Sequence, residues 1–393
     1  MRIAVFGGSF DPVHTQHVAV AKAAVESLRL DKIFIMPAFA PPHKRGRELS
    51  PDAARLEMCR LAFQEIENAE VSDYEISQGG VSYTYLTCRH FRSLYPNAEI
   101  FWLVGTDMLR DFPTWKNTES ILNDVTLAVC ARAETEDWAA RERALFREKY
   151  GKDFVTVGYN GADVSSTKIR VLAGAGMRLT PLTTEKTEEY IYENKLYFIE
   201  GAREALALET EKRKAHSLRV AETAAERAKK LGVPEKQAIA AALLHDCAKN
   251  LPADSPLLEG FSPPTEYGEV PPSVFHQYAG AYVAEHTLGI KDEEILNAVR
   301  YHTSGRENMS ALEKLIFLAD MVEEERKYAG VEEIRALFWK KQDASLPQEK
   351  GLDECLEEAL FQTIAFLKEK HAPVYPLTER AWQYISKERR ISI

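Results

Sequence analysis

The chain has 393 residues, which is more than one ordinary hydrophobic core needs and suits two domains. Apolar residues make up 45% and charged residues 28%, a composition typical of globular proteins. The formal net charge of −10 argues against a general nucleic-acid-binding or membrane-binding protein, while a local basic pocket for a phosphate ligand stays compatible with it.

The first half of the chain alternates apolar runs with helical patterns. Apolar residues spaced three to four apart predict helices over 18–30 and 52–66. Strands are predicted over 2–8, 32–38, 98–109, 125–132 and 153–159. This alternation predicts an α/β domain with a doubly wound, Rossmann-like parallel sheet, in which ligands bind at the carboxyl ends of the strands.

The second half shows helical periodicity and no convincing strand, which predicts an all-α domain. Its helical patterns cover 203–232, 234–250, 274–289, 292–303 and 310–327. We therefore predict two domains, 1–200 and 201–393. A long Pro-rich stretch at 252–273 indicates a functional or mobile loop.

Cysteine usage and hydropathy indicate the compartment. The five cysteines are scattered, odd in number and lack a CxxC pair, which argues against disulfides and a thiolate zinc site. The chain opens directly into a predicted strand, and no run of 18 apolar residues occurs. We expect a cytoplasmic protein with no membrane or nucleic-acid partner, and a homo-oligomer stays open.

The stretch "GGSFDPVHTQH" at 7–17 ends the first predicted strand. Its glycines let the backbone approach a ligand closely, and the N-terminus of the following helix favours phosphate. His14 and His17 lie three residues apart across that helix start and can face one phosphate chain. An isolated HxxH would indicate surface histidines, but this strand–turn–helix context favours a phosphate site.

This stretch resembles the (H/T)xGH signature of the nucleotidyltransferase superfamily, and in particular bacterial nicotinate-nucleotide adenylyltransferases. Further matches follow in order over about 195 residues: "PAFAPPHK", "VGTDMLRDFPTWK" and "SSTKIR". One departure is Gln16, which stands where the family usually has glycine. A side chain at this position would crowd the phosphates.

The resemblance implies transfer of AMP from ATP to nicotinate mononucleotide, with Mg²⁺, giving nicotinate adenine dinucleotide and pyrophosphate. The chemistry needs positioning and charge stabilisation rather than a covalent intermediate. The predicted catalytic residues of this half are His14, His17, Lys44 and Arg170. The predicted substrate-binding residues are Gly7, Gly8, Ser9, Phe10, His43, Thr84, Gly105, Asp107, Trp115, Ser166 and Thr167. The resemblance further implies that Asp107 contacts adenosine and that Trp115 stacks on the nicotinate ring.

Histidines and aspartates recur in the helical half, in or at the ends of five predicted helices, with His245 and Asp246 adjacent in one of them. They are His216, His245, Asp246, His276, His302 and Asp320. His302 and Asp320 follow apolar residues at helical spacing and are expected to point inward, where an unpaired carboxylate would be costly. Imidazole and carboxylate without thiolate suit Fe, Mn, Co, Ni or Zn. Six ligands with one bridging carboxylate predict two metal ions, which can share a hydroxide nucleophile.

The order H…HD…H…H…D resembles the HD hydrolase superfamily. The stretches "LLHDCAKN", "YHTSG", "IFLADMVEEER" and "GVEEIR" narrow the resemblance to symmetrical diadenosine tetraphosphate hydrolases over about 205–370. It implies a di-iron centre and hydrolysis of diadenosine tetraphosphate to two ADP, with Asp246 catalytic. Gln277 replaces the glycine that commonly follows the third histidine, and no ligand is lost. Lys249, expected to be catalytic, and Thr303 and Arg326 are the predicted phosphate contacts.

The combined hypothesis is a bifunctional enzyme acting on ATP, nicotinate mononucleotide and diadenosine tetraphosphate. One alternative keeps both folds and changes the substrates: another nucleotidyltransferase fused to a nucleotidase or phosphodiesterase. The "FPTW" context of Trp115 favours the nicotinate interpretation. A second alternative is a nucleotide sensor with an impaired first half, for which Gln16 is the sole support.

Overall fold

The computed structural model describes all residues except 41–48, 132–135, 162–163, 341–349 and 392–393. The described chain divides into two compact units. The first unit comprises Met1–Ile169 and Leu179–Leu196, and the second comprises Arg170–Arg178 and Tyr197–Ile393. The short segment Arg170–Arg178 therefore packs with the helical half of the chain, and each unit is described below by itself.

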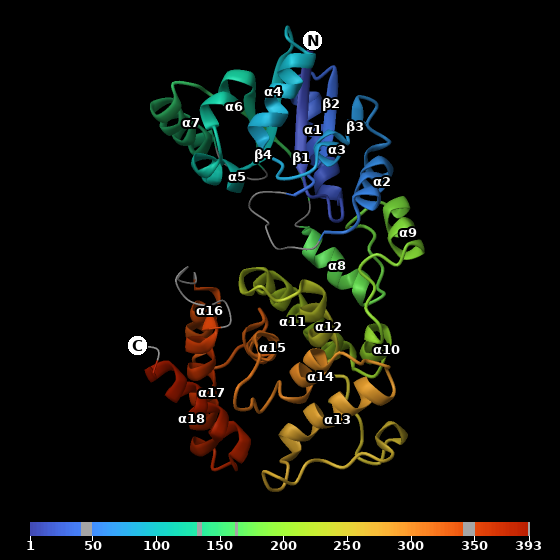
Figure 1. The fold of residues 1–393 in the computed structure, drawn as a ribbon, viewed down its shortest axis with the longest axis vertical. Coiled ribbons are helices and arrows are strands. Elements are labelled where there is room, and N and C mark those ends of the chain that lie inside the picture. The colour runs from blue at the N-terminus through green and yellow to red at the C-terminus, as the bar shows by residue number, and fades with distance from the viewer. Residues whose placement is uncertain (41–48, 132–135, 162–163, 341–349, 392–393) are drawn as a thin grey trace. The chain divides into compact units, whose positions relative to one another are not determined.

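The first unit contains a six-stranded sheet in the order β3-β2-β1-β4-β5-β6, with every neighbouring pair parallel (Figure 1). The strands are β1 (Arg2–Gly8), β2 (Lys32–Pro37), β3 (Ala69–Val71), β4 (Glu99–Gly105), β5 (Thr126–Ala131) and β6 (Val155–Gly158). This confirms the predicted doubly wound α/β fold. The strand order reverses between β1 and β4, which is where such sheets bind ligands at their carboxyl ends.

Helices connect these strands, as parallel pairing requires. They are α1 (Thr15–Leu28), α2 (Asp52–Phe63), α3 (Tyr74–Gln78), α4 (Thr84–Leu94), α5 (Thr106–Asp111), α6 (Thr118–Asp124) and α7 (Glu136–Tyr150). Two helices, α8 (Ser166–Gly174) and α9 (Glu185–Glu193), follow the last strand, and α8 belongs to the second unit from Arg170 onward. In α1 the buried residues Val20, Ala24 and Leu28 recur every fourth position, so one face packs inward. The helix ends where Arg29 adopts a left-handed backbone conformation, with φ of 49°.

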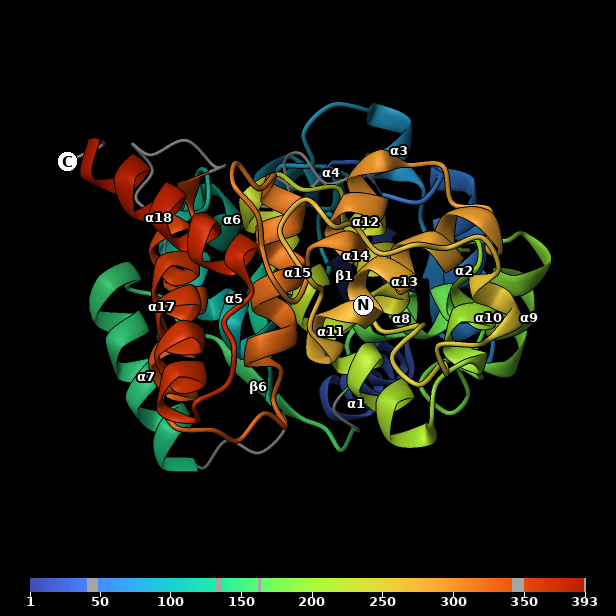
Figure 2. The same ribbon diagram turned by 90° about the horizontal axis from the view of Figure 1, so that it is seen from below.

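The second unit is helical throughout its described residues, as the periodicity predicts. Its helices are α10 (Ala202–Ala207), α11 (Glu211–Leu231), α12 (Glu235–Leu244), α13 (Pro272–His286), α14 (Glu293–Arg300), α15 (Ala311–Val322), α16 (Val331–Trp339), α17 (Asp353–Glu369) and α18 (Pro376–Ile391). Helices α17 and α18 run side by side in both views (Figures 1 and 2). The single helical pattern predicted over 203–232 is wrong in one detail. The chain breaks before Thr210, whose hydroxyl accepts from the backbone N–H of Arg213 and begins α11.

The remaining global expectations concern cysteines and membranes. All five cysteines are free and buried, which agrees with the absence of a disulfide framework. No helix among the described residues has the length and apolarity needed to cross a bilayer.

A buried arginine on α2 holds the segment that follows β1. Arg55 is 0% exposed, and its Nη1 donates to the carbonyl oxygens of Ala38 at 2.7 Å and Ser9 at 3.0 Å. Its Nε donates to the carbonyl of Ser50 at 3.2 Å, and its Nη2 pairs with Asp52. One side chain therefore joins the ends of β1 and β2 through their carbonyl groups.

We expect Arg55→Met to lower the free energy of unfolding by about 2–5 kcal/mol, because it leaves two inward-facing carbonyl oxygens without donors at roughly 1–3 kcal/mol each. Arg60→Met is the matched control, since Arg60 lies on the same helix and makes an exposed pair with Glu57. Urea unfolding of the full chain measures both. Equal midpoints for the two variants would contradict the role given to Arg55.

Candidate functional site

The carboxyl end of β1 carries the glycines of the first motif. A Cβ on Gly7 would lie 3.0 Å from the Trp102 ring, and one on Gly8 would lie 3.1 Å from the Phe10 ring. A side chain at either position would therefore push against an aromatic ring that packs on the backbone. Phe10 itself is 1% exposed and adopts a left-handed conformation, with φ of 47°. These contacts make the sharp turn that leads from the sheet into α1.

His14 and His17 are brought together at the start of α1. Their rings stack with centroids 3.6 Å apart, and the backbone N–H of His14 donates to Nδ1 of His17 at 3.2 Å. Because Nδ1 accepts, neutral His17 carries its proton on Nε2, which is then a donor. Burial lowers the pKa of His14 to about 4, so its imidazole is neutral near pH 7.

Distant segments of the first unit anchor this loop. The hydroxyl of Ser166 donates to the carbonyl of Pro12 at 2.9 Å, and that of Thr183 donates to Val13 at 3.0 Å. Gln16 donates its amide to the hydroxyl of Tyr159 at 2.7 Å. The side chain that was expected to crowd phosphates thus has a partner within the protein, beyond the end of β6.

The other residues predicted for this half follow neighbouring elements. Gly105 ends β4, and Asp107 lies exposed in the first turn of α5. A Cβ on Gly105 would lie 2.5 Å from Oδ1 of Asp107, so this glycine lets the carboxylate fold back over the strand end. Trp115 is half-buried with its ring 5.4 Å from that of Phe112. Thr84 begins α4, Ser9 follows β1, and Thr167 is buried in the first turn of α8. His43 and Lys44 lie outside the described residues.

Arg170 has a partner that the sequence did not suggest. It belongs to the second unit, is 5% exposed and donates through Nε and Nη2 to Oε1 of Glu235, at 2.8 and 2.5 Å. Glu235 is the first residue of α12. The contact with phosphate expected of Arg170 stays a prediction.

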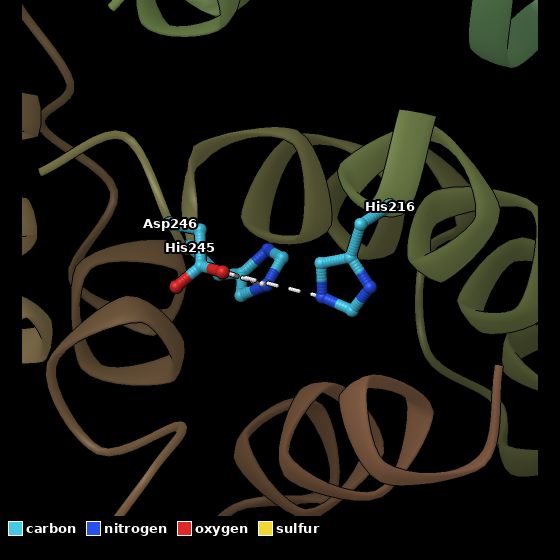
Figure 3. Close-up of side chains that lie close together, drawn as sticks. All are labelled: His216, His245 and Asp246. Atoms are coloured by element: carbon cyan, nitrogen blue, oxygen red, sulfur yellow. Dashed lines mark ion pairs between the residues drawn. The ribbon is translucent and has the colours of Figure 1, made fainter. Parts of the chain in front are cut away.

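In the second unit, all six predicted histidines and aspartates converge. His216 comes from α11, His245 and Asp246 end α12, and Figure 3 shows their side chains facing one another. His276 comes from α13, His302 follows α14, and Asp320 comes from α15. All but Asp320 are at most 5% exposed. Five helices spread over more than 100 residues therefore deliver these six groups, two of them from the end of α12, to a common point inside an apolar core.

Asp246 lies at the centre and faces different histidines with its two oxygens. Oδ2 lies 3.5 Å from Nε2 of His245 and 4.0 Å from Nε2 of His216. Oδ1 lies 3.3 Å from Nε2 of His276 and 3.5 Å from Nε2 of His302. Asp320 adds Oδ1 at 2.8 Å from His216 and 4.0 Å from His245. Asp246 therefore faces histidines with both oxygens, as a bridging ligand would, while His245, His302 and Asp320 also lie close enough to form a ligand group of their own.

The donor set fits metal ions. Nε2 of His245 and Oδ1 of Asp246 are buried and make no hydrogen bond within the described residues, and a buried polar atom in that state is costly. Nδ1 of His245 and of His302 lie 2.6 and 2.7 Å from the carbonyl oxygens of Ala242 and Val299, which can only accept. Both rings therefore carry a proton on Nδ1, so Nε2 is the nitrogen of each ring that would bind a metal.

The charge states also suit metal binding. Burial lowers the pKa of His276 to about 4 and lowers that of His302, so both are neutral near pH 7. Burial alone would lower the pKa of His245 too, but the facing carboxylates of Asp246 and Asp320 raise it to about 9, so a metal ion at this ring would take the place of its Nε2 proton. Burial alone would raise the pKa of Asp246, but facing His245, His276 and His302 outweigh it and hold that pKa well below its usual value. Neutral imidazoles and ionised carboxylates are the forms that bind metals.

Three cationic side chains line the cluster. Nη1 of Arg213 lies 2.7 Å from Oδ2 of Asp246, and Arg326 pairs with Oδ1 of Asp320. Nζ of Lys249 lies 2.9 Å from Nε2 of His276, which is 3.1 Å from the hydroxyl of Thr303. Lys249, Thr303 and Arg326 were predicted, whereas Arg213 was missed. The sequence could have predicted Arg213, because it lies one helical turn before His216 and therefore on the same face of the helix.

Gln277, which departs from the related family's glycine, pins the turn after His302. Its Oε1 accepts from the backbone N–H groups of Thr303 and Ser304 at 3.0 and 2.9 Å, and its Nε2 donates to the Ser304 hydroxyl at 2.9 Å. The side chain is 0% exposed. It therefore fixes the backbone that presents His302 and Thr303.

Comparison with known proteins agrees with both halves. A cytidylyltransferase-like family model matches residues 5–172, and an HD domain model matches 213–325. A probable nicotinate-nucleotide adenylyltransferase/Ap4A hydrolase of Mycoplasma genitalium is 31% identical, covering 83% of this chain and 88% of that protein. Its Mycoplasma pneumoniae counterpart is 30% identical over 81% of this chain and 88% of its own length. A probable nicotinate-nucleotide adenylyltransferase of Clostridium tetani is 36% identical, covering 49% of this chain and 98% of that protein.

The geometry of Asp246 predicts the metal content of a variant. Asp246→Ala removes the carboxylate that faces both halves of the cluster, so at least one bound metal ion is lost. Asp254→Ala, an exposed aspartate in the following loop, is the matched control. Elemental analysis of the purified full chains measures the difference. Equal metal content in the two variants and the parent would rule out a bridging role.

Proposed function

The chain belongs to the family of two-domain proteins that join a nicotinate-nucleotide adenylyltransferase to an Ap4A hydrolase, and we propose that it carries both activities, one in each unit. The first unit transfers AMP from ATP to nicotinate mononucleotide, and the second hydrolyses diadenosine tetraphosphate to two ADP. The main observation for the hydrolytic activity is the position of Asp246 within the HD domain, where its two oxygens face different pairs of histidines.

In the first unit, the phosphate of nicotinate mononucleotide attacks the α-phosphorus of ATP. A new P–O bond forms there while the bond to the β-phosphate breaks, and pyrophosphate leaves. Charge builds up on the phosphate oxygens, so His17 is suited to donate from Nε2. His14, stacked beneath it, has a neutral ring that holds His17 in place. Mg²⁺ bound with ATP shares the remaining charge.

The recognition residues of this half lie along the neighbouring strand end. Asp107, exposed where α5 begins, is suited to accept from the adenosine part of the substrate. Trp115 presents an indole that can stack on the flat nicotinate ring. The start of α8, with Ser166 and Thr167, offers backbone N–H groups to phosphate.

We predict that His17→Ala slows dinucleotide formation by roughly 10²-fold or more, the effect of losing one preorganised donor in the transition state. The assay follows nicotinate adenine dinucleotide made from ATP and nicotinate mononucleotide. Hydrolysis of diadenosine tetraphosphate by the same preparation is the internal control and stays at the parent's rate. Parental transfer by the variant would exclude this role for His17.

The neighbouring substitution Gln16→Gly separates two interpretations of this loop. Because the Gln16 amide is bonded to Tyr159, removing it frees no phosphate site, and kcat/KM for ATP does not rise. An increase would mean that the side chain obstructs the phosphates, and rescue of an inactive parent would favour the sensor hypothesis.

In the second unit, one metal ion would be held by His216, His245 and Asp246, and another by His276, His302 and Asp246. Asp320, which lies 2.8 Å from His216 and also groups with His245 and His302, would add a further carboxylate to the first ion. We propose iron as the metal. Such ions supply a hydroxide nucleophile at neutral pH and Lewis acidity toward a phosphoryl oxygen.

The chain's own cations complete the site. Arg213, Lys249 and Arg326 contact Asp246, His276 and Asp320, so they are placed to pair with the negative phosphates of a substrate seated on the cluster. Thr303 adds a hydroxyl donor. A tetraphosphate carries enough charge to engage all three cations, which supports a dinucleoside polyphosphate over a nucleoside monophosphate.

Product analysis tests the hydrolytic half. Water attacks one of the two central phosphorus atoms, and the bridging P–O bond between these phosphates breaks. The full chain, loaded with Fe²⁺ under anaerobic conditions, therefore converts diadenosine tetraphosphate to ADP alone. Reaction in H₂¹⁸O places one label in every second ADP. Chromatography and mass spectrometry measure both, with Asp246→Ala as the inactive control. Equal amounts of AMP and ATP would contradict the symmetrical cleavage.

A further inference from the structure

We propose that Glu323 is a positioning residue for the metal centre: its carboxylate fixes the ring and tautomer of His216 and strengthens the bond of His216 to a metal ion. The inference rests on the proposed metal site of the second unit. Neither the sequence pattern nor the HD motif assigned a role to this residue.

Glu323 ends α15 and is 2% exposed, so its carboxylate is set in protein rather than in water. Oε1 lies 3.2 Å from Nδ1 of His216, and Oε2 accepts from Nε of Arg219 at 2.6 Å and from the backbone N–H of Glu325 at 2.9 Å. An ionised carboxylate can only accept, so Nδ1 of His216 carries the proton. Nε2 faces Oδ1 of Asp320 at 2.8 Å, and that oxygen also only accepts. A metal ion bound at Nε2 would therefore take the place of a proton there, while Glu323 keeps the proton on Nδ1.

The contrast with the other histidines isolates this role. His245 and His302 direct Nδ1 to the backbone carbonyls of Ala242 and Val299, which are neutral acceptors three residues earlier. Nδ1 of His276 lies 3.2 Å from Nζ of Lys249 instead. Within the described residues, His216 alone of these four has a carboxylate as its Nδ1 acceptor. A full negative charge there raises the basicity of the imidazole, and substitution of such partners costs about 10–100-fold in metal affinity.

The position of Glu323 does not depend on a bound metal. Arg335, on α16, donates Nε to the carbonyl of Val322 at 2.9 Å and Nη2 to those of Glu323 at 2.7 Å and Arg326 at 2.8 Å. The side chain of Arg335 therefore fixes the backbone of the turn after α15. Arg219 holds the carboxylate itself from the side of α11, one turn beyond His216.

The test measures metal affinity without hydrolysis. Metal-free full chain is titrated with Co²⁺, followed by calorimetry and by the visible absorption of the bound ion. Glu323→Ala weakens one of the two binding steps by about 10–100-fold and leaves the other unchanged. Glu323→Gln weakens the same step less, because its amide oxygen still accepts from Nδ1. Glu324→Gln, an exposed neighbour, is the matched control and binds as the parent does.

The outcomes separate the possible failures. Parental affinity in both steps of Glu323→Ala would overturn the positioning role. Weakening of both steps together with a lower unfolding midpoint would assign Glu323 to folding and would also overturn it. A parent that binds no Co²⁺ would instead overturn the metal centre, a result distinguishable from the other two.

Discussion

Asp246 carries a negative charge inside an apolar core, and the packing of the second unit depends on the cations and hydrogen-bond donors that stabilise this charge. A carboxylate that is 2% exposed is stable only if cations or donors surround it. Imidazoles from four places in the chain and the guanidinium of Arg213 do so. Each contributing helix must keep its position and its rotation about its own axis if its side chains are to reach Asp246. The helix packing and the cluster therefore form one constraint, and cations bound there would reinforce it.

The first unit is governed by backbone groups rather than by a buried charge. The turn after β1 exposes carbonyls at Ser9, Pro12 and Val13, and side chains from distant segments satisfy them: Arg55, Ser166 and Thr183. The glycines preceding the turn are required by the rings of Trp102 and Phe10. With its carbonyls held from within the unit, this turn presents the paired histidines at the place where the strand order reverses.

Patterns local in sequence were sufficient to predict the two fold classes and the cluster of histidines and aspartates. The alternation of strands and helices, and the inward spacing of His302 and Asp320, follow from period and burial. Partners that lie far along the chain were not predictable, because periodicity says nothing of them. In the sequence, Arg55 looks like any other residue of a helix. No sequence pattern near Arg170 indicates its ion pair with Glu235, which lies 65 residues further along the chain. Glu323 begins a run of five consecutive charged residues that resembles a solvated turn, although the structure buries it.

The way the histidines are oriented bears on how this protein can change over evolutionary time. His245 and His302 rely on the main chain at Ala242 and Val299, and every amino acid supplies that carbonyl. The side chains at Ala242 and Val299 need only fit the space available. Other small apolar residues could replace them without removing the carbonyl that accepts from His245 or His302. His216 has a side chain 107 residues away as its Nδ1 partner, so in the proposed role a single substitution there that removes the acceptor would weaken its orientation. The halves of the cluster are therefore unequally tolerant of mutation, and lineages that lose metal binding should lose it first on the side of His216.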